Sequence, residues 1–171
     1  MKAWLLAALL AVVPILAHGA DFTGKVVRIL DGDTLEAMHD GAPVRVRLEG
    51  IDCPEKAQPF GTKARQFAAD LAFSQLVTVK DHGKDRYGRT LGEVVLPDGR
   101  SLNRELIRAG FAWWYRRYSK DKTLEALEAA ARAAKRGLWA DPHAVPPWDW
   151  RRGKRPPAGL ESLRAPTGPN P

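Results

Sequence analysis

Cysteine and histidine are scarce in this chain, and each shortage excludes a kind of site. The 171 residues include a single cysteine, Cys53, so no disulfide can form within the chain. The four histidines show none of the spacings that zinc sites use; they are His18, His39, His82 and His143. No glycine-rich phosphate-binding loop is present either. Stability must therefore come from packing, with a bound metal ion as a further contributor.

A long apolar run occurs at the N-terminus. Lys2 precedes an apolar segment from Ala3 to Ala17, and the small residues that follow suit a signal peptidase. The segment is about 15 residues long and contains Pro14, whereas a membrane-spanning helix needs roughly 20 apolar residues. We expect residues 1–20 to be a cleaved secretory signal peptide, which predicts a secreted or periplasmic protein with no membrane attachment after cleavage. The alternative is an uncleaved N-terminal anchor.

Acidic residues are outnumbered by basic ones. There are 27 Lys and Arg against 20 Asp and Glu, a formal net charge of +7, and loss of Lys2 with the signal peptide would leave 26 against 20, or +6. This surplus favours a polyanionic partner, nucleic acid before membrane. Charge alone is weak evidence, because many exported proteins are basic without binding a polyanion.

Composition divides the remaining chain into two parts. Residues 21–150 are long enough for one domain with an ordinary core. Residues 151–171 contain five prolines, three glycines, five Lys or Arg and one Glu, a composition that cannot bury a core. We predict that residues 151–171 form a basic, Pro/Gly-rich disordered tail.

Hydrophobic patterning predicts strands first and helices later. Five segments rich in β-branched or alternating apolar residues read as strands: Phe22–Leu30, Thr34–Met38, Pro43–Glu49, Gln75–Lys80 and Arg89–Leu96. In the third segment, Val44, Val46 and Leu48 share one face, so Arg47 should point away from the core.

Three helices are predicted from apolar spacing and end signals. One is capped by Thr62 and runs to Ala72, and the others span Ser101–Ala109 and Thr123–Arg136. Five short strands, with one helix before the fourth and two at the end, fit a five-stranded Greek-key β-barrel of the OB type. The predicted fold class is α+β.

Acids and arginines cluster in a way that suits phosphodiester chemistry. Asp33, Arg47, Asp52 and Glu55 lie within 23 residues, and the basic turn Asp85–Arg89 follows about thirty residues later. Taken singly, each acid is more often a turn residue and each arginine a surface residue. Together, the carboxylates suit a hard cation and the guanidinium groups suit a phosphate.

Four segments in order closely resemble the staphylococcal nuclease (thermonuclease) family. They are Ile29–Thr34, Val46–Glu55, Asp85–Arg89 and Gly110–Trp113, and the resemblance extends from Phe22 to Trp139. It implies an OB-fold nuclease domain and a calcium-dependent endonuclease that hydrolyses phosphodiester bonds of DNA and RNA with little sequence specificity, leaving 3′-phosphorylated products. The substrate would be single-stranded or double-stranded, and no stable protein partner is predicted. Mg²⁺ and Mn²⁺ stay as alternatives to Ca²⁺.

The resemblance also implies roles for individual residues. Asp33 and Asp52 match the metal-binding aspartates of the family, and the third protein ligand would be the backbone carbonyl of Cys53, where relatives usually carry Thr. Glu55 matches the residue that orients or deprotonates the attacking water. Two catalytic arginines of the family, which bind the phosphate, match Arg47 and Arg89.

Substrate binding would involve tyrosines and basic residues. Tyr87 matches a family tyrosine near the 5′-phosphate, and Tyr118 matches the second tyrosine of a pair whose first position is Arg116 here. Tyr115 is a second candidate for stacking on a base. Phosphate contacts along the strand are expected from Lys84, Arg86 and Arg116.

Two other functions fit parts of the sequence. A catalytically inactive OB-fold module that binds nucleic acid would have lost an acid or an arginine of the site, and none is missing. A basic exported domain that binds an acidic polysaccharide would need no carboxylate cluster.

Overall fold

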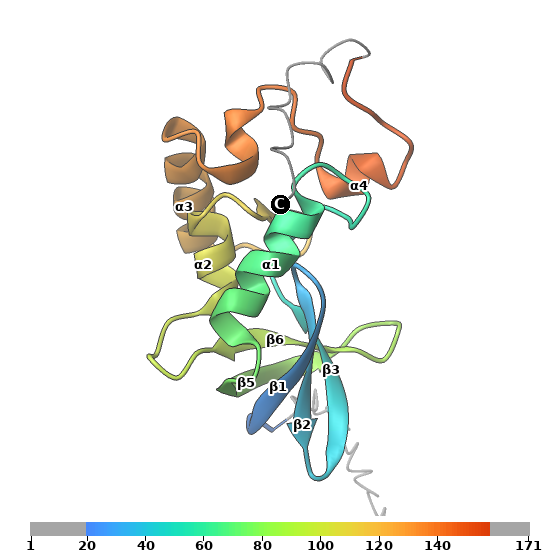
Figure 1. The fold of residues 1–171 in the computed structure, drawn as a ribbon, viewed down its shortest axis with the longest axis vertical. Helices are drawn as coiled ribbons and strands as arrows, with labels where there is room; N and C mark the ends of the chain where they lie inside the picture. The colour runs from blue at the N-terminus through green and yellow to red at the C-terminus, as the bar shows by residue number, and fades with distance from the viewer. Residues whose placement is uncertain (1–19, 158–171) are drawn as a thin grey trace, which may run out of the picture.

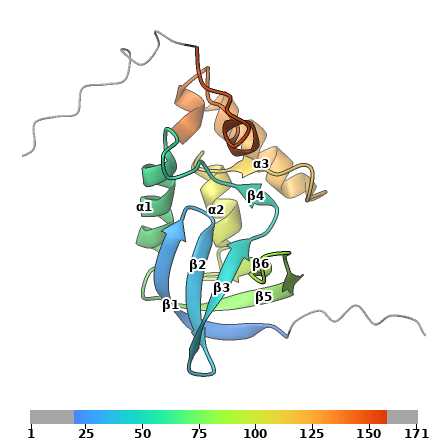
Figure 2. The same cartoon turned by 90° about the vertical axis from the view of Figure 1, so that its right-hand side faces the viewer.

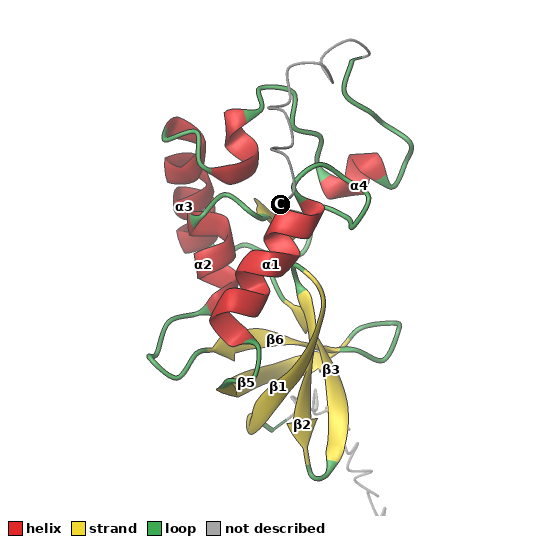
Figure 3. Ribbon diagram, viewed as in Figure 1, coloured by secondary structure: helices red, strands yellow, loops and turns green. Residues whose placement is uncertain are grey.

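The structure, a computed structural model, describes residues 20–157. Nineteen residues of the expected signal peptide and residues 158–171 lie outside the described part of the chain. A β-barrel occupies one end of the molecule, and helices pack over the other end (Figure 1). Figure 3 separates these two layers by colour. Within residues 20–157, no helix is long and apolar enough to cross a membrane.

Five strands close into the barrel in the order β1-β2-β3-β6-β5. Only β3 and β6 pair in parallel; the other neighbours are antiparallel. The predicted five-stranded α+β barrel is therefore confirmed. The strands are β1 (Phe22–Asp31), β2 (Thr34–His39), β3 (Ala42–Leu48), β5 (Leu76–Lys84) and β6 (Thr90–Val95).

A second, two-stranded sheet lies outside the barrel and was not predicted. It pairs β4 (Ile51–Asp52) with β7 (Trp113–Trp114), so that Asp52 lies opposite Trp113. Both strands are two residues long, and hydrophobic periodicity cannot detect so short a segment. This sheet fixes the backbone of Asp52 to the helical layer.

The hairpin between β2 and β3 follows from its turn residues. Asp40 and Gly41 both have positive φ angles, 47° and 78°. A two-residue hairpin of this type requires positive φ at both positions, which Asp-Gly tolerates well. The register is thereby fixed, and Arg47 lies opposite Thr34.

The core combines barrel strands with helix faces. Fully buried side chains on the barrel include Val26, Leu35, Val46, Val77 and Val94. Alanines on α1 (Gly61–Ala72) and larger apolar residues on α2 (Leu102–Arg108) pack against them; these are Ala64, Ala68, Ala72, Leu102, Leu106 and Ile107. Figure 2 shows β1, β2 and β3 from the front with α1 beside them.

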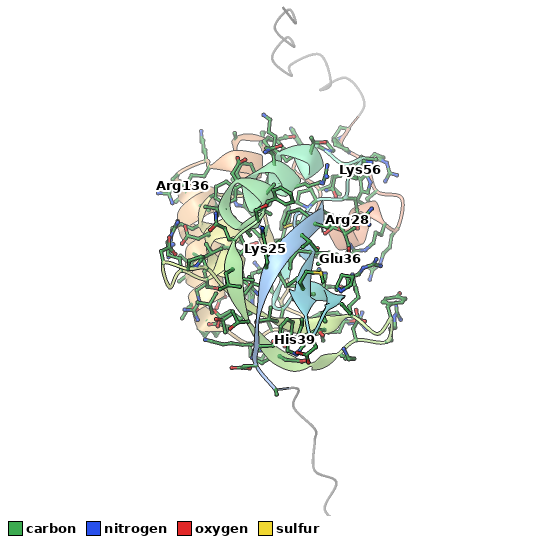
Figure 4. All side chains as sticks on the ribbon, turned by 60° about the horizontal axis from the view of Figure 1, so that its bottom comes forward. Lys25, Arg28, Glu36, His39, Lys56 and Arg136 are labelled. Atoms are coloured by element: carbon green, nitrogen blue, oxygen red, sulfur yellow. The ribbon has the colours of Figure 1, made fainter. Side chains whose placement is uncertain are left out.

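The outer face of the barrel carries ion pairs. Glu36 on β2 accepts from Arg45 at 2.8 Å, and Arg28 on β1 lies 3.9 Å from the same carboxylate (Figure 4). Such exposed pairs contribute little to stability.

The three predicted helices are present, but the start of α1 and the end of α3 differ from the prediction by more than one residue. The prediction that Thr62 caps α1 is wrong: the cap is Phe60, which has a φ of 67° and makes no side-chain cap bond. The last predicted helix is α3 (Lys122–Ala133), and it ends before Arg136 because Lys135 turns the backbone with a φ of 50°. A 3-10 helix, η1 (Gly137–Ala140), and a short helix, α4 (Pro147–Trp150), follow α3.

A buried carboxylate joins α3 to the second sheet. Glu128 on α3 accepts from the backbone N–H of Trp114 at 3.3 Å and from the guanidinium groups of Arg116 at 3.1 Å and Arg132 at 3.4 Å. Arg116, expected as a phosphate contact, is thus paired within the fold. Since Trp114 pairs with Ile51 on β4, Glu128 supports the strand that carries Asp52.

Replacement of Glu128 by alanine should destabilise the protein by about 2 kcal/mol, because it leaves a buried N–H donor and two guanidinium groups without their acceptor. Glu125→Ala, which removes an exposed carboxylate of the same helix, should cost less than about 1 kcal/mol. Chemical denaturation of both variants measures the difference. Equal losses would contradict the supporting role of Glu128.

Candidate active site

Two buried carboxylates from different parts of the chain converge on one arginine. Asp33 lies in the turn between β1 and β2, and Asp52 lies on β4; both side chains are almost fully buried. Nη2 of Arg47 is 3.1 Å from Oδ2 of Asp33 and 3.0 Å from Oδ1 of Asp52. The structure therefore brings together three residues that the sequence singled out.

Arg47 also holds the chain between β3 and β4. Its Nη1 donates to the carbonyls of Leu48 at 2.6 Å and Ile51 at 3.0 Å. The strand pattern correctly placed Arg47 outside the barrel, yet its side chain is only 12% exposed. The reason is that β4 folds back beside it and supplies acceptors, so this guanidinium is a buried cation with both terminal nitrogens hydrogen-bonded.

Cys53 follows Asp52 and is buried next to Gly32. Its backbone N–H donates to Oδ2 of Asp33 at 2.6 Å, which ties the two aspartate-bearing segments together. A Cβ on Gly32 would lie 2.9 Å from the Cys53 sulfur, so the close packing requires glycine there. Burial, reinforced by the negative charge of Asp33, raises the pKa of the Cys53 thiol well above its usual value. The thiol is therefore neutral and not a nucleophile.

Burial and mutual repulsion disfavour ionisation of the carboxyl groups in this cluster. Burial, followed by repulsion from Asp33, raises the pKa of Asp31 to about 7. The pKa of Asp52 is raised as well, mainly by burial and also by Asp33, despite its bonds to arginines. Asp31, the last residue of β1, thus belongs to the cluster. A further cation is the natural partner for such a group.

The donor set fits a hard divalent cation. Asp33 and Asp52 bring carboxylate oxygens close together, since both contact Nη2 of Arg47, and hard cations bind such oxygen ligands together with waters. Among residues 20–157, no three side chains of His, Cys, Asp or Glu form a metal-binding group by themselves. A cation here would be held by two side chains, completed by a backbone carbonyl and water.

Glu55 lies on the loop between β4 and α1, with its carboxylate half-exposed. Its backbone N–H donates to Oε1 of Gln58 at 3.1 Å, and Nε2 of Gln58 donates to the carbonyl of Val145 at 2.5 Å. The loop also approaches α1 closely, since a Cβ on Gly61 would lie 1.9 Å from the Glu55 carbonyl oxygen. Buried Gln58 therefore links the Glu55 loop to the C-terminal segment.

Arg151 enters the same site, although the sequence placed it in a disordered tail. Its guanidinium donates to Oδ2 of Asp52 at 2.7 Å and to Oε1 of Glu55 at 2.6 Å. The composition-based boundary between residues 150 and 151 therefore separates Arg151 from the fold to which it belongs. Composition misses this residue because its contacts are with residues far away in the sequence. Of the predicted tail, the structure describes residues 151–157.

Arg89 is held within its own turn, next to the site. Its Nε donates to Oδ2 of Asp85 at 2.7 Å, and Asp85 also accepts from the backbone N–H groups of Tyr87 and Arg89. Burial alone would raise the pKa of Asp85, but these bonds outweigh it and lower that pKa. Parallel pairing places Leu91 of β6 opposite Arg47, so the turn emerges at the strand beside Arg47.

The predicted substrate-binding residues form two surface groups. Tyr87 is exposed, with the Arg86 and Arg89 guanidinium groups 4.7 and 5.5 Å from its ring centre, and Lys84 bonds to Thr90 at 3.2 Å. Tyr118 is also exposed and contacts Tyr115, which stacks on Trp148 of α4 at 5.2 Å. These rings and cations are accessible to a ligand.

The closed barrel, with its aspartates and the Asp85–Arg89 turn, is an OB fold of the nuclease type. Sequence comparison supports the same class. A sequence model of the family described as "Staphylococcal nuclease homologue" matches residues 45–141. The chain belongs to this family, as the resemblance predicted.

The chain is similar to two bacterial proteins over most of their length and to a plant protein over a third of its length. A protein from Escherichia coli O157:H7 named "Uncharacterized endonuclease" is 48% identical over 135 residues, which cover 79% of this chain and 88% of the relative. A "Micrococcal nuclease" from Shigella flexneri is 47% identical over 146 residues, covering 80% and 84%. A rice protein named "Probable staphylococcal-like nuclease CAN1" is 36% identical over 111 residues, covering 65% of this chain and 33% of the relative.

Replacement of Arg47 by methionine should destabilise the protein by about 3 kcal/mol, because two buried carboxylates lose their shared cation. Arg45→Met is the matched control: Arg45 lies on the same strand, is exposed and pairs with Glu36, so its loss should cost at most about 1 kcal/mol. Denaturant unfolding without added divalent cations measures both. A similar loss in the two variants would contradict the compensating role of Arg47.

Proposed function

We propose that this protein is an endonuclease that hydrolyses phosphodiester bonds of DNA and RNA with a divalent cation, in the first place Ca²⁺. The observation that carries the proposal is the convergence of Asp33 and Asp52 on one nitrogen of Arg47. Family membership and relatives named endonuclease and micrococcal nuclease support hydrolysis of a nucleic acid. Mg²⁺ and Mn²⁺ are the alternatives, because both also bind oxygen ligands.

The cation would be held by Asp33, Asp52 and the backbone carbonyl of Cys53. When bound, it would polarise the scissile phosphate and offset its negative charge. Asp33 is kept in place by the Cys53 N–H, so its orientation does not depend on the cation. The sparse set of protein ligands leaves coordination positions for a substrate oxygen and water.

Glu55 would act on the attacking water. The water oxygen forms a bond to phosphorus while one of its protons passes to the Glu55 carboxylate. The bond from phosphorus to the 5′-oxygen breaks, and that oxygen takes a proton from solvent. The products are a 3′-phosphate and a 5′-hydroxyl, which matches the end chemistry implied by the resemblance.

Arg89 would act directly on the charge that develops on the phosphate, and Arg47 would support this mainly by fixing the aspartates. Arg89 is partly exposed and paired to Asp85, so it can exchange that partner for a nonbridging oxygen. Arg47 is buried among its own acceptors and mainly fixes the two aspartates. Loss of one preorganised donor typically lowers a rate about 100-fold to 1000-fold.

Binding of the strand would use the exposed groups around the site. Tyr87 with Arg86 and Lys84 offers a ring beside cations, and Tyr118 offers a second exposed ring. Stacking on an aromatic ring contributes about 1 to 3 kcal/mol per base without sequence preference. The net charge of +7 supports attraction to any polynucleotide.

We further propose that the protein works outside the cytoplasm, on the basis of its N-terminal apolar segment. Extracellular calcium sites commonly have dissociation constants of about 10⁻⁴ to 10⁻³ M, and a site with two carboxylates is of that kind.

Heat-denatured DNA should be cleaved by the purified mature chain in millimolar Ca²⁺ and left intact in EGTA. Analysis of product ends should find 3′-phosphates, and parallel reactions with Mg²⁺ or Mn²⁺ alone identify the cation that is used. Cleavage that persists in EGTA would contradict the cation site. Intact DNA that is nevertheless retarded in a gel would favour the binding module instead.

Glu55→Ser should lower turnover about 100-fold or more, because the water loses its proton acceptor, and should preserve DNA binding. The control is Glu125→Ser, an exposed carboxylate on α3 away from the site. Initial rates and filter binding separate the two effects. Unchanged turnover in Glu55→Ser would remove Glu55 from the mechanism.

A further inference from the structure

Arg151 bridges the two carboxylates that flank Cys53 and Pro54. Its Nη2 lies 2.7 Å from Oδ2 of Asp52, and its Nη1 lies 3.4 Å from Oδ1 of Asp52 and 2.6 Å from Oε1 of Glu55. The planar guanidinium thus binds the buried Asp52 carboxylate through both terminal nitrogens. One of them, Nη1, also binds the half-exposed Glu55 carboxylate.

The position of Arg151 is built by the segment that precedes it. Trp148 of α4 stacks on Tyr115 with an interplanar angle of 2° and makes a T-shaped contact with Trp113. Upstream, the Val145 carbonyl accepts from buried Gln58, which also binds the Glu55 backbone. Figure 1 shows α4 beside the loop that leads from β4 to α1. The aromatic contacts and Gln58 therefore hold the end of α4 in a position from which Arg151 reaches the site.

Both oxygens of Asp52 are already taken by arginines. Oδ1 accepts from Arg47 at 3.0 Å, and Oδ2 accepts from Arg151 at 2.7 Å. A divalent cation that binds Asp52 must therefore take the place of one guanidinium, since two cations at the same oxygen repel each other.

Arg151 is the arginine that can give way. Arg47 is 12% exposed and bound to two backbone carbonyls, whereas the Arg151 side chain is 43% exposed and its partners in the site are carboxylates. Release of a half-exposed guanidinium into water costs little, while release of a buried one costs much more.

We propose that Arg151 is a positioning residue: a tethered counter-ion that holds Asp52 and Glu55 while the cation is absent and leaves Asp52 when a divalent cation binds. This inference rests on the cation site of the proposed function. Cation binding would then compete with the contact between Arg151 and Asp52. The cost of displacing Arg151 weakens the apparent affinity for the cation.

Titration calorimetry with CaCl₂ and no nucleic acid tests the competition directly. Arg151→Gln should bind Ca²⁺ about two- to fivefold more tightly than the unchanged chain, the fold-change expected for loss of an exposed competing ion pair. Arg152→Gln is the matched control, because Arg152 is the next residue, is more exposed and, within residues 20–157, pairs with Asp149 alone at 3.8 Å. It removes the same charge and should change the affinity less than about twofold.

Equal or weaker Ca²⁺ binding by Arg151→Gln, relative to Arg152→Gln, would overturn the inference. Arg151→Lys provides a second variant in case the glutamine change disturbs folding. It keeps the charge without the planar fork, so its affinity should fall between those of the unchanged chain and Arg151→Gln.

The movement itself can be followed by NMR of the ¹⁵N-labelled chain. The guanidinium resonance of Arg151, identified by its absence in Arg151→Lys, should shift during the Ca²⁺ titration with the midpoint found by calorimetry. A resonance that stays unchanged at saturating Ca²⁺ would overturn the inference while leaving the proposed function intact. If the unchanged chain binds no Ca²⁺, both the inference and the calcium site fail.

Discussion

The sharing of one guanidinium by two buried carboxylates organises this site. Removing Asp33 and Asp52 from water is costly unless each is paired, and Arg47 pairs with both through a single nitrogen. The same side chain binds the carbonyls at the end of β3 and on β4, so the charge pairing and the path of the backbone depend on one another. Burial, followed by repulsion from Asp33, raises the pKa of Asp31, so a third carboxyl group of the cluster resists ionisation without a further cation nearby.

The surrounding fold explains why Asp33 and Asp52 are buried and lie close to each other. The turn after β1 presents Asp33, the short sheet with β7 presents Asp52, and the Cys53 N–H connects the two segments. Glu128 then anchors that short sheet to α3. A barrel typical of nucleic-acid-binding proteins thus acquires a carboxylate site from segments that lie outside the barrel.

Local features of the sequence predicted the barrel well, and long-range contacts account for what they missed. Alternation identified β3 and the outward direction of Arg47, because side-chain direction in a strand is a local property. The cap at Thr62 was wrong, since Phe60 begins α1 through a left-handed backbone and no side-chain bond. Arg151 was assigned to a tail because composition says nothing about a partner 99 residues away. The short β4 and β7 likewise depend on each other rather than on their own sequence.

A crystal structure of the mature chain soaked in Mn²⁺, with anomalous scattering measured, tests the central claim most directly. Mn²⁺ is a hard cation that takes oxygen ligands and can be located without ambiguity. The account predicts one strong anomalous peak bound by the carboxylates of Asp33 and Asp52 and by the backbone carbonyl of Cys53. A peak bound elsewhere, or no peak while Asp33 and Asp52 keep their bonds to Arg47, would contradict it.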